Sequence, residues 1–130
     1  MNLRNRYAVI TVRTLYGLMM LFSGVSGFMA LRSGSMEGIP EAMRVITQSL
    51  VSSGLFQMIK VTEIVAGLML VAGFLPALAI IFLAPIGVGV VVFNSQVAPN
   101  LIVSGLIVCA FEAYFGYVYW DQYKALFARK

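Results

Sequence analysis

Two residue types that carry much of the metal and redox chemistry of proteins are scarce in this 130-residue chain. It has no histidine, which excludes histidine-ligated haem and the common zinc sites. Its one cysteine, Cys109, has no second thiol in the chain with which to form a disulfide. We therefore expect no bound metal, and we interpret Cys109 as a small buried apolar residue.

Charged residues are few as well, at 11% of the chain against 61% hydrophobic residues. Residues 64–111 contain no Asp, Glu, Lys or Arg, which leaves room for two membrane spans of ~20 residues each. Soluble domains carry more than twice this share of charge, about 25%. The composition therefore predicts a membrane protein.

The apolar runs predict an all-α fold, an integral membrane four-helix bundle formed by one domain, residues 1–130. The four spans are expected at residues 7–31, 55–74, 77–93 and 101–120. Gly73 suits a helix end and Pro76 a helix start, so spans two and three should form a tight hairpin. Pro85 should kink or loosen the third span. The first basic-then-apolar run resembles a signal peptide, but it is ~25 residues long and has no cleavage site, so we interpret it as a retained span.

The only long loop, residues 32–54, lies between spans one and two. Met43, Ile46 and Leu50 follow helical spacing after Pro40, which predicts a short amphipathic helix over the bundle or on the membrane surface. An ordinary segment that caps the bundle is the alternative.

Basic residues flank the apolar runs and form no tract, so we expect membrane lipid and no nucleic acid as a partner. They lie near both ends of the chain: Arg4, Arg6, Lys124, Arg129 and Lys130. Because basic residues favour the cytoplasmic side, both termini should be cytoplasmic and the long loop should face outward. The expected location is a plasma membrane, of the bacterial inner-membrane type.

Four ionisable residues lie inside the spans: Arg13, Lys60, Glu63 and Glu112. Charged groups at membrane depth usually face the protein interior or a wet cavity, so these are the candidate ligand-binding residues. A rise of ~1.5 Å per residue places Arg13 and Glu112 at matching depths, about 9 and 12 Å inside the cytoplasmic boundary, which predicts an ion pair between them. Lys60 and Glu63 share one helix face in the outer half of the membrane. Lysine before glutamate is the weaker order along a helix, so at least one of them should serve something outside its own helix.

The second span, with KVTE at residues 60–63 followed by Gly67 and Gly73, resembles the DoxX-like family of small four-span membrane proteins. Shorter motifs agree, namely RTLYG at 13–17, FSG at 22–24, GIP at 38–40 and PI at 85–86. The resemblance implies a bundle related to membrane folds that handle quinones, vitamin K or sterols. It also implies a role beside quinone-linked complexes or redox-stress enzymes. Where relatives often carry a base after the first-span Ser-Gly, this chain has VSG at 25–27.

Three functions are open at this point. The first is an accessory module of a membrane redox system that binds a hydrophobic molecule such as a quinone. In it Arg13 and Lys60 donate to carbonyl oxygens, Glu63 and Glu112 exchange protons or hold the bases, and a redox-enzyme partner supplies electrons. The second is an isomerase-type enzyme, which requires Glu63 and Glu112 to line one cavity with neither locked to a base. The third is a structural subunit of a larger membrane complex. Apart from a bound quinone or lipid, no cofactor is expected.

Overall fold

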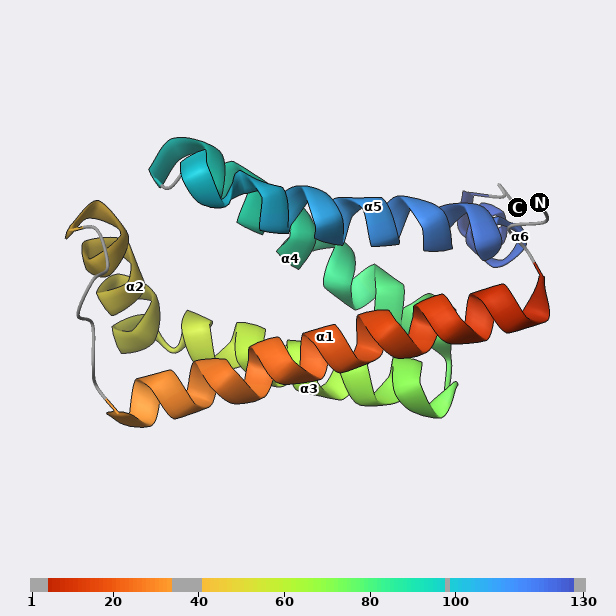
Figure 1. The fold of residues 1–130 in the computed structure, drawn as a ribbon, viewed down its shortest axis with the longest axis horizontal. Coiled ribbons are helices and arrows are strands. Elements are labelled where there is room, and N and C mark those ends of the chain that lie inside the picture. Colours follow the sequence, from red (N-terminus) through yellow and green to blue (C-terminus); the bar gives the residue numbers. More distant parts are fainter. Residues whose placement is uncertain (1–4, 34–40, 98, 128–130) are drawn as a thin grey trace.

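The computed structural model describes residues 5–33, 41–97 and 99–127, and every regular element in them is a helix (Figure 1). The prediction of an all-α fold is confirmed. The helices are α1 (Arg6–Ser33), α2 (Glu41–Ser53), α3 (Leu55–Ala72), α4 (Pro76–Val97), η1 (Pro99–Leu101), α5 (Ile102–Val118), α6 (Trp120–Tyr123) and η2 (Lys124–Phe127).

Three of these helices, α1, α3 and α4, are long and apolar enough to cross a membrane. A fourth span exists if α5 is taken together with the bent segment of α6 and η2, which turns away from α5 by 74°. The predicted fourth span ran to residue 120, whereas α5 ends at Val118. The chain turns at Tyr119, and the hydroxyl of Tyr123 then donates to the carbonyl of Ala77 at 2.8 Å, which ties the segment to the start of α4.

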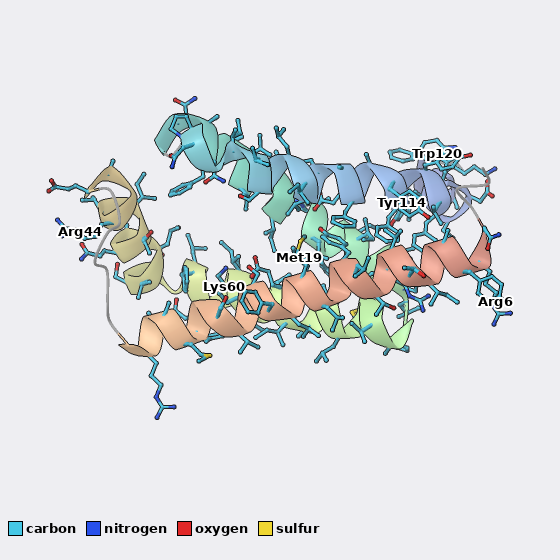
Figure 2. All side chains as sticks on the ribbon, in the orientation of Figure 1. Arg6, Met19, Arg44, Lys60, Tyr114 and Trp120 are labelled. Carbon is cyan, nitrogen blue, oxygen red and sulfur yellow. The ribbon has the colours of Figure 1, made fainter. Side chains whose placement is uncertain are left out.

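The long helices pack as two pairs, α1 along α3 and α4 along α5 (Figure 1). Contacts between α3 and α4 join the pairs, while α1 and α5 touch much less. The start of α1 and the segment α6 lie at one end of the molecule, and α2 lies at the other end, as the positions of Arg6, Trp120 and Arg44 in Figure 2 also show. Of the four contacts between long helices, α1–α3, α3–α4, α4–α5 and α1–α5, the last is the weakest. The seam between α1 and α5 is therefore the least tightly packed.

Glycines set the distance between α1 and α3. A Cβ on Gly17 would lie 2.8 Å from the carbonyl oxygen of Gly67, and a Cβ on Gly67 would lie 2.8 Å from that of Gly17. The two backbones are thus in direct contact, as small residues in membrane helices allow. The buried side chains Tyr16 and Leu70 pack beside this contact in the hydrophobic core.

The hairpin predicted between spans two and three is confirmed. Gly73 takes a left-handed conformation (φ 75°), its N–H bonds to Leu70 O, and the N–H of Phe74 bonds to Met69 O. These two bonds form a Schellman motif, which satisfies carbonyls at the helix end. Helix α4 then begins at Pro76, a residue suited to a first helical turn, and continues through Pro85.

We expect Gly17→Ala to destabilise the protein by ~1–3 kcal/mol, because the added methyl group must push α1 and α3 apart. Gly89→Ala is the matched control, since a Cβ there meets no atom within 4 Å and alanine favours the helix. The free energy of unfolding in mixed micelles, measured by titration with a denaturing detergent, compares the two. Equal stability of both variants would contradict the close contact.

Candidate functional site

Lys60 and Glu63 form an ion pair inside the helical core, one turn apart on α3. Nζ of Lys60 lies 3.1 Å from Oε2 of Glu63, and the Glu63 side chain is only 5% exposed. Ser23 of α1 completes the cluster, because its hydroxyl donates to the same Oε2 at 3.1 Å and accepts from Lys60 Nζ at 3.4 Å. Both charged residues therefore reach a partner outside their own helix, as their sequence order predicted.

Helix α1 makes room for the lysine with a glycine. A Cβ on Gly27 would lie 2.6 Å from both Cδ and Cε of Lys60, so the lysine stem lies directly against the α1 backbone. The ammonium group also sits 5.4 Å from the centre of the Phe56 ring, within the range of a cation–π contact. Lys60 is thus held by Glu63, Ser23, Gly27 and Phe56.

Beside this cluster lies a cavity of about 250 Å³ that all four long helices line. Most of its wall is apolar, and three polar residues face it: Ser23, Glu63 and Ser104. The complete lining is Met19, Met20, Ser23, Glu63, Leu83, Ile86, Val90, Ser104, Ile107 and Val108. Apolar walls with a few polar groups are typical of small-molecule sites.

The wall formed by α4 and α5 carries its own polar contact. Nδ2 of Asn94, a residue only 5% exposed, donates to Oγ of Ser104 at 3.4 Å. This hydrogen bond joins α4 to α5 next to the cavity, since Ser104 is one of the lining residues. Ser104 and Ile107 of α5 line the cavity and are also exposed, so the cavity is open to the surface on its α5 side.

Glu112 lies outside the cavity lining and has a different partner. The hydroxyl of the fully buried Tyr16 donates to its Oε1 at 3.2 Å. The Tyr16 ring stacks on Phe111, with ring centres 4.9 Å apart. On the other side the carboxylate lies against α4, where a Cβ on Gly87 would come within 2.5 Å of it. Glu112 is therefore enclosed by an aromatic cluster and a glycine.

The predicted ion pair between Arg13 and Glu112 is wrong. The guanidinium of Arg13 lies at the end of α3, where a Cβ on Gly73 would be 2.9 Å from Nη2, and its buried Nε has no hydrogen-bond partner among the described residues. A cation at a helix C-terminus interacts favourably with the helix dipole. Matching depth did not fix the direction in which each side chain points, and Tyr16 occupies the place beside Glu112.

The four candidate residues thus separate into three places. Lys60 and Glu63 are together, and of the four only Glu63 lines the cavity. The isomerase-type enzyme required Glu63 and Glu112 on one cavity, both free of a base, and this geometry does not meet that requirement. Ser23 and Ser104 were not among the predicted site residues. A serine in a helix commonly bonds its own backbone, so neither position carries a distinct signal in the sequence.

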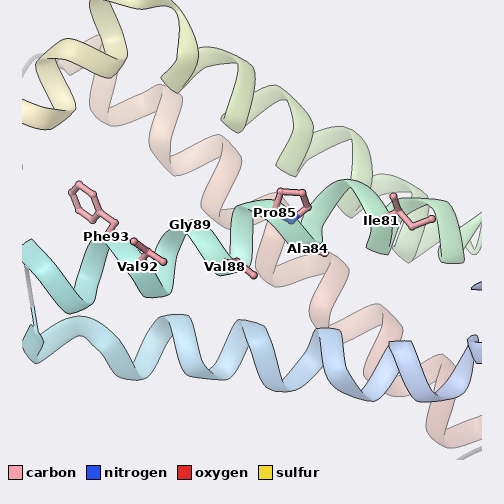
Figure 3. A pocket seen from close by; sticks show the side chains of 7 residues that line it. All are labelled: Ile81, Ala84, Pro85, Val88, Gly89, Val92 and Phe93. Carbon is pink, nitrogen blue, oxygen red and sulfur yellow. The ribbon is translucent and has the colours of Figure 1, made fainter.

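A second, broader depression of about 820 Å³ runs along one face of α4 (Figure 3). All of its lining residues come from this one helix, as Figure 3 shows, and none is charged. They are Ile81, Ala84, Pro85, Val88, Gly89, Val92 and Phe93. A face of this kind suits contact with lipid acyl chains.

The chain matches no family model, no curated protein and no solved structure. The resemblance to the DoxX-like family remains a prediction from the motifs.

A double-mutant cycle tests the partner of Glu112. We expect Tyr16→Phe and Glu112→Leu to couple by about 0.5–3 kcal/mol in the free energy of unfolding, because the two side chains share a partly buried hydrogen bond. The control cycle combines Arg13→Gln with Glu112→Leu and should be additive within about 0.5 kcal/mol. Coupling in the control cycle and none in the first would reverse the assignment.

Proposed function

We propose that this chain is a four-span membrane protein that binds the head group of a hydrophobic small molecule in the cavity between its two helix pairs. The observation that carries the proposal is the cavity itself, with apolar walls and the carboxylate of Glu63 among its polar residues. Ser23 and Ser104 are the other polar residues of the binding site. Lys60 acts from behind the wall by holding Glu63 in place.

The size of the cavity favours one small ring. Pockets for drug-sized ligands measure ~300–1,000 Å³, and this cavity, at about 250 Å³, lies just below that range. A long apolar tail would not fit beside the ring. It would leave through the seam between α1 and α5, where Ile107 is 47% exposed, and lie in the lipid.

The proposed membrane fold is a four-helix bundle in a bacterial-type plasma membrane. Helices α1, α3, α4 and α5 span it, and α2 is the amphipathic helix on the outer surface, near the cavity end of α3. The basic residues near both chain ends support cytoplasmic termini.

Within this fold a ring of the quinone–quinol type is a natural ligand, as the likeness to DoxX proteins suggests. The chain itself holds no histidine and one cysteine, so a partner enzyme would supply the electrons. We propose the role of an accessory module of such a membrane redox system.

Cysteine labelling tests the orientation. In a Cys109→Ala background, Asn5→Cys and Gln122→Cys should react with a membrane-impermeant maleimide only from the cytoplasmic side, and Ser49→Cys only from outside, because all three positions are exposed. Reaction of all three positions from one side would contradict four spans.

Filling the cavity tests the function. Val108→Phe should weaken binding of a decyl-substituted benzoquinone and of its quinol to protein in lipid nanodiscs, because the larger ring occupies the cavity. Val103→Phe is the matched control: it makes the same change on α5 at a residue that is 60% exposed and outside the cavity lining. Calorimetric titration against empty nanodiscs corrects for partition into lipid. If neither probe binds the unaltered protein, or if both variants bind alike, the proposal is wrong.

A further inference from the structure

The polar groups on the cavity wall are not equally available to a ligand. The hydroxyl of Ser23 donates a hydrogen bond to Oε2 of Glu63, and Ser104 accepts a hydrogen bond from Asn94. Lys60 donates to Ser23 and Glu63 and is not part of the lining. The basic group that the sequence suggested as a donor to a carbonyl is therefore already engaged.

Glu63 differs, because both of its hydrogen bonds go to one oxygen. Lys60 and Ser23 contact Oε2, and Oε1 has no hydrogen-bond partner in the described part of the chain. Protein atoms do not cover Oε1 completely. In the described residues only Arg13 Nε and Gln57 Oε1 are both fully buried and without a hydrogen-bond partner, and Glu63 Oε1 is not one of them. Glu63 is a lining residue of the cavity, and Oε1 is its oxygen without a hydrogen bond to the described residues.

We infer that the ligand carries a neutral hydrogen-bond donor, a hydroxyl group on its ring, which donates to Oε1 of Glu63. The inference rests on the proposed function and names the class of its ligand as a lipid-soluble phenol, quinol or alcohol. A ligand with only carbonyl or ether oxygens would set lone pairs against the carboxylate and leave the acceptor unsatisfied.

The charge of the cluster excludes a cationic head group. The charges of Lys60 and Glu63 already cancel, so an ammonium group in the cavity would add an uncompensated positive charge among apolar walls. A hydroxyl group satisfies the acceptor and adds no charge.

Two probes that differ only in this donor test the inference: 4-nonylphenol and its methyl ether, 4-nonylanisole. We expect the phenol to bind the protein in lipid nanodiscs about tenfold or more tightly, after correction with empty nanodiscs, since hydrogen bonds to charged groups are strong. Equal or tighter binding of the ether would overturn the inference and leave the proposed function intact. Failure of both probes to bind would overturn both.

A variant pair assigns the preference to Glu63. Glu63→Leu combined with Lys60→Met removes both charges and the acceptor oxygens together, so no buried charge is left alone, and the preference for the phenol should disappear. Glu112→Gln should retain it, because Glu112 lies outside the lining. Circular dichroism and a monodisperse elution profile confirm that each variant is folded. A preference that survives in the folded double variant would show that Glu63 is not the acceptor.

Discussion

A lysine inside an apolar helix is the constraint to which the rest of this structure responds. Permissive scales put the cost of a lysine at the centre of a membrane span at ~2.5–3.5 kcal/mol, and a charged residue in a span is usually paired. Glu63 supplies the opposite charge one turn along α3, and Ser23 supplies a hydroxyl from α1. Gly27 lets the lysine stem lie against the α1 backbone. A slide of α1 along α3 by one turn would lose both contacts, so the cluster fixes the register of this helix pair.

The two carboxylates of the apolar segments then serve different ends. Glu112 of α5 accepts a hydrogen bond from Tyr16 of α1 and lies against Gly87 of α4. These contacts join the two helix pairs. Glu63 stabilises the lysine through Oε2 and is also a lining residue of the cavity. A buried ion pair adds little net stability compared with apolar packing, whereas specificity is its better-attested role. Here that role is to fix a register and to hold an acceptor in place.

Helical spacing predicted more of this arrangement than charge did. The spacing of three residues correctly placed Lys60 and Glu63 on one helix face, because the geometry of one helix determines its faces. Matching membrane depth and opposite charge paired Arg13 with Glu112 wrongly. These two properties do not tell how each helix is rotated about its axis, or that Tyr16 competes for Glu112. Ser23 and Ser104 were missed because serine in a helix commonly bonds its own backbone and gives no distinct signal.

The central claim is that the Lys60–Glu63 pair serves a ligand and not only the packing of α1 on α3. Mass spectrometry of the organic extract from protein purified in mild detergent tests it most directly, with unaltered protein compared with the variant that combines Glu63→Leu and Lys60→Met. We expect a lipid-soluble, hydroxyl-bearing compound in the extract of the unaltered protein and its loss from the variant. Identical extracts, with bulk membrane lipid alone in both, would contradict it.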